Sequence, residues 1–457
     1  MIKLRNPIIK NTLITIMPSI VSILFSLASV PIFLNFGDLQ TYGEYIFAHI
    51  IISFGFFLTF GFAKITALEI IKKKELAKSY FVFSILKTII IFIITLILFK
   101  IFRYYKFSIF SESFDILIIC GICLTTLFCY LESILQGLKL FKSNAISNFF
   151  FYGFSITSSS LIYFFNEEVT VNNLFIFSLT IKVLSISAVI LMLIKNKILN
   201  KGRFSLINIF ANYKSAGWIT LSLILVQIYD FLDKYLIKIA IGSKILGSFS
   251  IAQQISGKMS IISKGLSFTL LPNVSKKKNG IKITTKAIEF ILYIFSLFLV
   301  VIVFPSLKII LSLWLGKSFS ELILNLSIIF FFISWVSCIS HIYITFYEGN
   351  KIFKKNSLIE ITFLPLFLTM LIVSYIKKDI MYFCMSLLIK EIIFLFSRSW
   401  MIKNKIIIFN EIVFNIICML CLTTLIYFKY NYLYVLLSVI YTYYLIKKIK
   451  LENLKIA

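Results

Sequence analysis

The chain has 457 residues, of which 60% are hydrophobic and only 14% are charged, and its formal net charge is +27. A soluble globular protein of this length needs more charged residues to cover its surface, so the composition excludes that class. Apolar runs of about 20 residues, enough to cross a hydrocarbon core, recur along the whole chain, whereas a transmembrane β-barrel would alternate within short segments. We therefore expect an all-α polytopic membrane protein.

Fourteen apolar runs are predicted to span the membrane. In chain order they occupy residues 11–34, 45–70, 80–102, 114–136, 145–165, 173–194, 215–240, 246–271, 286–312, 321–346, 357–376, 380–401, 406–428 and 431–446. No small-residue cleavage site follows the basic N-terminus, so the first run is expected to be an uncleaved helix.

The longest polar stretch separates the sixth and seventh spans, at about residues 195–214. It divides the chain into an N-terminal half (1–200) and a C-terminal half (201–403). Two additional helices and a tail follow (404–457). No loop is long enough to form a separate domain.

The basic residues lie mostly in clusters between the apolar runs. If the N-terminus is cytoplasmic, 29 of the 46 Lys and Arg residues fall on the inner side, nine on the outer side and eight within the spans. Inner clusters include Lys72–Lys74, Lys276–Lys278 and the group of Arg398, Lys403 and Lys405. The positive-inside rule then predicts an even number of spans with both termini in the cytoplasm. The charge is topogenic, and no nucleic-acid partner is expected.

Seven cysteines lie within or beside the apolar runs, including the pairs "CGIC" (120–123) and "CMLC" (418–421). These pairs have the spacing of metal ligands, but no histidine or further cysteine lies near them in a polar context. We therefore expect packing residues, with no metal site, no catalytic cysteine and no cofactor.

Two motifs recur across the halves. "GLKLFKSN" (137–144) is similar to "GNKIFKKN" (349–356), at an offset of 212 residues. Aligning Gly43 with Gly247, at an offset of 204, also pairs Ala48 with Ala252. Both offsets correspond to six spans, so we predict two parallel six-helix repeats. Substrate sites in such transporters lie between the halves, near the middle of the membrane.

Several segments resemble the bacterial polysaccharide transporters, the Wzx-type O-antigen flippases of the multidrug/oligosaccharidyl-lipid/polysaccharide exporter superfamily. They are "PSIVSILFSLASVPIFLNFGDLQTYGEYIFAHIIISFGFFLTFGFA", "LESILQGLKLFKSNAISN", "VQIYDFLDKYLIKIAIGSKILGSFSIAQQIS" and "GLSFTLLPNVSK". The resemblance covers nearly the whole chain and implies a MATE-like fold in the bacterial inner membrane.

The resemblance also implies a function. The substrate class would be an undecaprenyl-pyrophosphate-linked oligosaccharide, such as the O-antigen repeat unit of lipopolysaccharide biosynthesis. It would move from the cytoplasmic to the periplasmic leaflet by alternating access. Membrane lipids, the glycan polymerase and the chain-length regulator are the expected partners.

Eight basic residues fall inside the predicted spans: Lys64, Lys87, Lys182, Lys234, Lys258, Lys264, Lys308 and Lys390. A charge near the bilayer centre costs about 2.5–3.5 kcal/mol on insertion scales, so such residues usually face a cavity or a partner. Lys64 in span two, Lys258 and Lys264 in span eight, and Lys234 in span seven are the candidate ligands of the anionic pyrophosphate. The alternative is that these side chains snorkel to the membrane surface.

Span seven contains "DFLDKYL", which places Asp230, Asp233 and Lys234 within about one helical turn. This group is either a structural ion pair or a carboxylate that binds a coupling H⁺ or Na⁺. Lys390 and Glu391 in span twelve form an internal pair or line the cavity. Glu360, near a cytoplasmic end, is expected to be paired or to snorkel.

Two other functions compete with a flippase. An exporter of drugs or of another lipid-linked substrate would share the fold, but a cationic drug calls for acidic cavity residues and the lysines outnumber these here. A membrane polysaccharide polymerase, ligase or glycosyltransferase needs a large outer loop with catalytic groups, and the predicted outer loops are short.

Overall fold

The computed structural model describes residues 21, 24–25, 27–35, 37–59, 61–104, 112–138, 140–157, 160–162, 170–196, 213–260, 263, 266, 280–350, 352–400, 406–427 and 431–454. Within these residues the regular structure is entirely helical, which confirms the all-α membrane fold. The chain forms two compact units, residues 1–235 and 236–457. The half boundary predicted near residue 200 stays a prediction.

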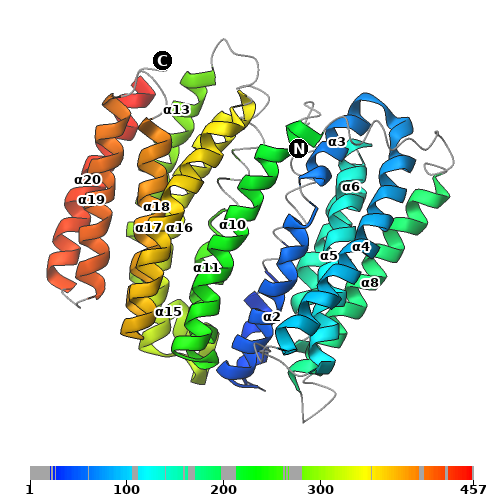
Figure 1. The fold of residues 1–457 in the computed structure, drawn as a ribbon. Helices are drawn as coiled ribbons and strands as arrows, with labels where there is room; N and C mark the ends of the chain where they lie inside the picture. Colours follow the sequence, from blue (N-terminus) through cyan, green and yellow to red (C-terminus); the bar gives the residue numbers. More distant parts are fainter. Residues whose placement is uncertain are drawn as a thin grey trace, which may run out of the picture. The chain divides into compact units, whose positions relative to one another are not determined.

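The helices of the first unit gather around α5 (Figure 1). They are α2 (Leu39–Phe57), α3 (Phe62–Lys72), α4 (Ala77–Tyr104), α5 (Glu112–Gly137), α6 (Phe141–Asn148), α7 (Ser155–Thr157) and α8 (Val171–Lys195). A further helix, α10 (Tyr213–Ala240), contacts α2 and runs across the boundary into the second unit. The short 3₁₀ turn η1 (Lys74–Leu76) precedes α4, and the π-helical stretch η2 (Phe149–Phe154) joins α6 to α7.

The helices of the second unit gather around α16 in the same way. They are α11 (Ser243–Gly257), α13 (Gly280–Phe290), α14 (Ser296–Phe298), α15 (Phe304–Leu315), α16 (Glu321–Gly349), α17 (Phe353–Lys377), α18 (Ile380–Trp400), α19 (Ile406–Tyr427) and α20 (Asn431–Leu454). Two π-helical stretches, η4 (Ile291–Phe295) and η5 (Leu299–Val303), flank α14, and the 3₁₀ turn η6 (Gly316–Ser318) follows α15.

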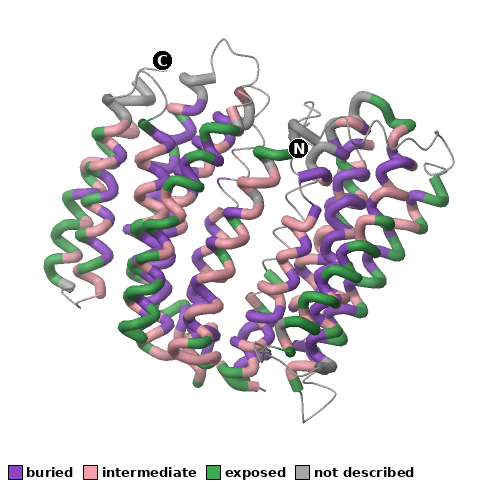
Figure 2. Tube along the Cα trace, in the orientation of Figure 1, coloured by how far each residue is buried: buried purple, intermediate pink, exposed green. Residues whose placement is uncertain are grey.

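The two central helices occupy equivalent places in the predicted repeat, as spans four and ten. Each is largely buried, whereas α4 exposes much of its surface, as Figure 2 shows by colour. A buried central helix with exposed apolar neighbours is the arrangement expected of a bundle in lipid, where the outer faces contact acyl chains.

Small residues allow α2 and α3 to approach α5 closely. A Cβ added at Gly55 would lie 2.6 Å from the Ile122 carbonyl oxygen, and one at Gly137 would lie 2.7 Å from Ile70 Cβ. The Thr126 hydroxyl of α5 donates to the Gly55 carbonyl at 3.1 Å. Close packing and interhelical hydrogen bonds hold these helices together, because burying apolar surface gains little in lipid.

The repeat is visible at the level of single residues. α2 and α11 begin 204 residues apart, the offset predicted from their sequences. The aligned residues Gly43 and Gly247 are both buried, and so are Ala48 and Ala252. α2 packs against α5, and α11 packs against α16. The prediction of two six-helix repeats is confirmed.

Spans two and eight are broken, although the sequence predicts continuous helices. α2 ends at Phe57, and α3 begins at Phe62 after Gly61, whose φ is +67°. α11 ends at Gly257, and a tight turn follows in which the Met259 amide donates to the Ser256 carbonyl at 3.0 Å. Both breaks fall inside segments that the hydropathy pattern assigns to the membrane.

Within the described part of the chain, eight helical stretches are long and apolar enough to cross a membrane. They are Lys74–Ile101, Phe114–Gly137, Val171–Lys195, Thr284–Ser318, Glu321–Tyr347, Lys354–Lys377, Ile380–Trp400 and Phe409–Tyr427. The broken spans two and eight do not appear as single long helices for the reason just given.

The last helix, α20, packs against span nine and against α19. The Tyr434 hydroxyl of α20 donates to the Val300 carbonyl, at 2.9 Å, within the π-helical stretch η5. Tyr441 donates to the buried Asn415 of α19 at 2.5 Å. Side-chain donors of this kind can satisfy backbone groups where the regular helical ladder is disturbed.

Candidate functional site

The break of span eight places a predicted substrate lysine at an irregular point of the backbone. Lys258 is the first residue after α11, and its side chain is half-buried. Its backbone amide donates to the Ile255 carbonyl at 3.3 Å in an i→i+3 turn. In broken membrane helices, the exposed helix ends and unwound backbone commonly bind ions and charged substrate groups.

Span two has a lysine at a similar place. Lys64 is the third residue of α3, directly after the break that contains Gly61. The structure describes the backbone of Lys64 and not its side chain, and Lys264 lies outside the described residues. The two equivalent spans therefore each combine a break with a lysine at or just after it.

The acidic and basic residues of α10 form a tight local group. Lys234 Nζ donates to the Asp230 carbonyl oxygen at 2.8 Å and lies 3.8 Å from Asp233 Oδ1. Asp233 Oδ1 also accepts from the Lys234 backbone amide at 2.7 Å. Asp233 and Lys234 are buried, whereas Asp230 is exposed. This geometry is a buried ion pair held within one helix.

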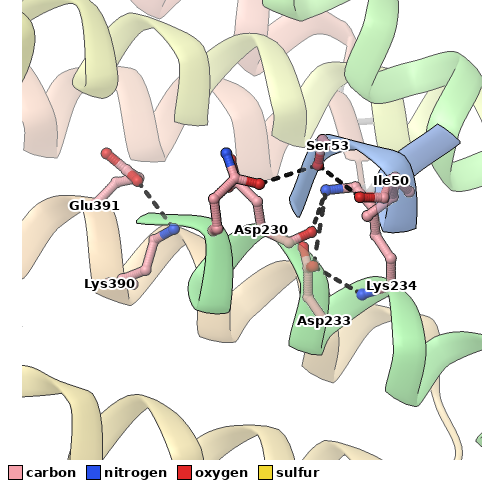
Figure 3. A network of polar contacts seen from close by, with 8 residues as sticks. Ile50, Ser53, Asp230, Asp233, Lys234, Lys390 and Glu391 are labelled. Carbon is pink, nitrogen blue, oxygen red and sulfur yellow. Dashed lines mark hydrogen bonds and ion pairs between the residues drawn. The ribbon is translucent and has the colours of Figure 1, made fainter. Parts of the chain in front are cut away.

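The same face of α10 contacts α2 within the first unit. The Ser53 hydroxyl donates to Gln227 Oε1 at 3.0 Å, and the Phe54 and Phe231 rings meet edge to face at 4.9 Å between centroids. Ser53 also donates to the Ile50 carbonyl, as Figure 3 shows. The Asp230–Lys234 group thus lies within a turn of a contact with broken span two.

Lys390 and Glu391 of α18 form an ion pair with 3.2 Å between Nζ and Oε1. The Lys390 ammonium also lies over the Phe367 ring of α17, 5.4 Å from its centroid. The side chain of Lys390 is only 9% exposed. The predicted internal pair is present, and its role in transport stays a prediction.

Lys390 has an equivalent in the first unit that the choice of candidate residues missed. The segments "SLTIK" (178–182) and "SLLIK" (386–390) match at an offset of 208, and "IKNK" follows each at 194–197 and 402–405. Lys182 is buried and lies over the Phe151 ring, 5.3 Å from its centroid. Each half therefore holds one lysine of its last span over a ring of the preceding span, an arrangement worth about 2 kcal/mol when desolvated.

A second missed group joins α16, α17 and α18. The Arg398 guanidinium donates to Asn356 Oδ1 at 3.0 Å, Ser340 Oγ at 2.5 Å and Glu360 Oε1 at 3.1 Å. The Tyr347 hydroxyl donates to the Arg398 carbonyl at 2.7 Å. The sequence assigns Arg398 to an inner cluster, and the structure adds that its side chain is only 4% exposed; the side of the membrane on which it lies stays a prediction. Glu360 is paired, as expected.

The described residues contain no group of three His, Cys, Asp or Glu side chains arranged to hold a metal ion. All seven cysteines are free thiols. What the chain does provide is cationic groups at helix breaks and buried ion pairs. These groups can bind an anion in a low-dielectric setting without forming covalent intermediates.

Comparison with known families and structures gives a consistent result. The family model described as "Polysaccharide biosynthesis protein" matches residues 8–278. No curated protein matches the chain. Among solved structures, the lipid II flippase MurJ in an inward closed conformation is similar at 16% identity, with a TM-score of 0.68. That match covers 96% of this chain and 98% of the MurJ chain.

Transporters of the MOP superfamily are also similar. One from Pyrococcus furiosus, described as having a binding pocket of reverse polarity, has 14% identity and a TM-score of 0.60. The match covers 86% of this chain and 94% of that one. A mutant MATE transporter of Vibrio cholerae has 12% identity and a TM-score of 0.61, covering 86% and 95%. At these identities the likeness establishes the fold, and it confirms the MATE-like architecture.

Proposed function

Because the chain belongs to the polysaccharide biosynthesis protein family, we propose that it is a flippase for lipid-linked oligosaccharides. Its substrate would be an undecaprenyl-pyrophosphate-linked repeat unit, such as that of an O-antigen. The chain would move this unit from the cytoplasmic to the periplasmic leaflet of a bacterial inner membrane. Both termini would then lie in the cytoplasm.

The observation that carries this proposal is the pair of broken spans. Spans two and eight are equivalent in the repeat, and each has a lysine at or next to its break, Lys64 and Lys258. A pyrophosphate headgroup carries several negative charges, and fixed ammonium groups would stabilise it inside the membrane. Lys234 and Lys264 are further candidate ligands.

Alternating access follows from the duplicated architecture. The two six-helix halves would rock against each other, so that the lysines face one side of the membrane and then the other, while the polyprenyl tail stays in lipid. Coupling to H⁺ or Na⁺ would use Asp230 or Asp233, the carboxylates beside Lys234.

The likeness to MurJ supports a lipid-linked substrate, since MurJ is a lipid II flippase. The likeness to MATE transporters keeps a multidrug exporter as the alternative. The lysines at the breaks favour an anionic substrate over a cationic drug.

Deletion of the gene in its native host tests the proposal. We expect lipid-linked repeat units to accumulate on the cytoplasmic face and the surface glycan to disappear. Unchanged glycan export would contradict the proposal. Purified protein in vesicles, given a fluorescent undecaprenyl-pyrophosphate oligosaccharide and an imposed H⁺ or Na⁺ gradient, would then identify the coupling ion.

Single variants test the cationic site. We expect Lys64→Ala and Lys258→Ala each to lower the flipping rate about tenfold, the effect of losing one charge-assisted contact. Lys317→Ala, in the exposed turn after α15, is the matched control and should flip normally. Wild-type rates in both break variants, at normal expression, would rule out the electrostatic role.

A further inference from the structure

Lys87 is the single Lys, Arg, Asp or Glu residue between positions 79 and 99 of the sequence, and it lies in the middle of α4. The neighbouring side chains of Leu86, Ile89 and Ile90 are exposed, as expected of a helix that faces lipid. A charge on such a helix is costly unless it finds a partner inside the bundle.

The Lys87 ammonium turns inward and reaches the break of span two. Nζ donates to the Thr59 carbonyl oxygen at 2.8 Å and contacts the Tyr130 hydroxyl of α5 at 3.0 Å. It also lies 4.9 Å from the centroid of the Phe62 ring, over one face. Lys87 therefore contacts Thr59 in the break after α2, the first residue of α3 and the central helix of the unit.

The Thr59 carbonyl oxygen accepts hydrogen bonds from three donors. It accepts from the Phe62 amide at 3.1 Å, from the Tyr130 hydroxyl at 3.1 Å and from Lys87. Thr59 lies two residues beyond Phe57, where α2 ends, and so lies close to the negative C-terminal end of that helix's dipole. A positively charged ammonium is favourable at this point.

At the break of span eight, in the second unit, a different donor contacts the backbone. The Met259 carbonyl accepts from the thiol of Cys338 on α16, with 3.6 Å between sulfur and oxygen. Cys338 lies 208 residues after Tyr130, the offset that also relates Lys182 to Lys390. A thiol is a weak donor. Span nine, the counterpart of α4, has no Lys or Arg between residues 287 and 307 of the sequence, so the ammonium contact is not duplicated.

We infer that Lys87 is a positioning residue that locks the break of span two, so that α3 stays fixed to α2 and α5. It contacts the backbone and not the substrate. Its link to transport rests on the proposed function, because α3 carries Lys64. The lock itself is a property of the first unit and is testable without any transport assay.

Hydrogen–deuterium exchange on the full chain in lipid nanodiscs tests the lock. Lys87→Met keeps the apolar stem and removes the charge and the donors. We expect exchange of the amides at 58–66 to rise about tenfold, as for the loss of one charge-assisted hydrogen bond, while α8 exchanges as before. Thr88→Val is the matched control, since the Thr88 hydroxyl donates to Ser84 of its own helix.

Exchange at 58–66 that stays within twofold of wild type, or a uniform rise over the whole unit, would overturn the inference. If Lys87→Met does not fold, Tyr130→Phe decides, because it removes one donor to Thr59 and keeps the ring. We expect a local rise of about threefold there, and no change would also overturn the inference. A wild-type protein that flips no lipid would refute the proposed function and leave the exchange result intact.

Discussion

At the scale of single residues, the buried cations Arg398, Lys87 and Lys182 are each held by hydrogen bonds, an ion pair or an aromatic ring. Arg398 donates to three side chains and is nearly inaccessible. Lys87 and Lys182 each lie over an aromatic ring. A buried charge without partners is strongly unfavourable, so replacing a residue that contacts one of these cations should destabilise the protein.

Arg398→Met should strongly destabilise the second unit. The substitution leaves the Glu360 carboxylate buried without its cation, which typically costs about 3–5 kcal/mol. Thermal melting of the detergent-solubilised protein measures the loss. Lys448→Met is the control: Lys448 of α20 pairs with Glu411 of α19, and both side chains are partly exposed (31% and 21%), so about 0–1 kcal/mol is expected. Equal losses in both variants would contradict the account of the buried network.

Some of the buried lysines can be identified from the sequence. The match of "SLTIK" with "SLLIK" pairs Lys182 with Lys390 before any coordinates are known. The burial of Arg398 is not readable, because a charge near the end of an apolar run looks the same whether it meets water or a partner. Its partner Glu360 lies 38 residues earlier on another helix.

At the scale of helices, the first unit depends on how closely α2 can approach α5. Gly55 lies against the Ile122 carbonyl and the Thr125 side chain, and no larger residue fits there without movement. The contact also precedes the break of span two by only a few residues. Packing at Gly55 and the lock at Lys87 therefore act on the same stretch of backbone.

Gly55→Leu should separate α2 from α5 and destabilise the first unit by about 1–3 kcal/mol, the usual cost of overpacking. Gly217→Ala is the control, because a Cβ at Gly217 of α10 meets nothing within 4 Å. Melting temperatures of the two variants, measured in the same detergent, provide the comparison. A Gly55→Leu protein as stable as wild type would show that the close approach is dispensable.

Hydropathy predicts where the membrane helices lie, but it does not predict that spans two and eight are interrupted. A hydropathy pattern reports where apolar residues lie, and both halves of a broken span are apolar. Gly61 and Gly257 were available as signals, but glycine is also frequent in unbroken membrane helices. The break becomes evident from the backbone turn and from the donors that reach its carbonyl.

At the scale of the whole molecule, the duplicated order of helices follows from two short loop motifs. Equivalent loops of two parallel repeats must make the same turn and therefore keep similar residues. Weak matches between such loops indicate a duplication when they occur in the same order in both halves. The compact units divide within α10, most of which lies with the first unit, whereas the longest polar stretch of the sequence lies at about residues 195–214. Sequence order alone does not say against which unit a connecting helix packs.

The predicted topology is open to a direct measurement. A fluorescent protein fused after Ala457 should fluoresce, and alkaline phosphatase at the same position should be inactive, because the C-terminus is expected in the cytoplasm. Alkaline phosphatase inserted after Lys378, in the turn between α17 and α18, should be active. The opposite pattern at either site would show that the number or orientation of spans is wrong.

The unequal lengths of α2 and α11 have a geometric consequence. Both begin at equivalent residues, but α2 has 19 residues and α11 has 15. Four residues advance a helix by about 6 Å and rotate it by only about 40° beyond a full turn. The joint of span two thus lies one turn farther from its starting loop than the joint of span eight, with nearly the same angular setting. The two helices therefore differ in length, but the chain leaves each of them at nearly the same angle around the helix axis. A chimera that exchanges α2 and α11 should change the helix length by four residues, so that this angle is kept.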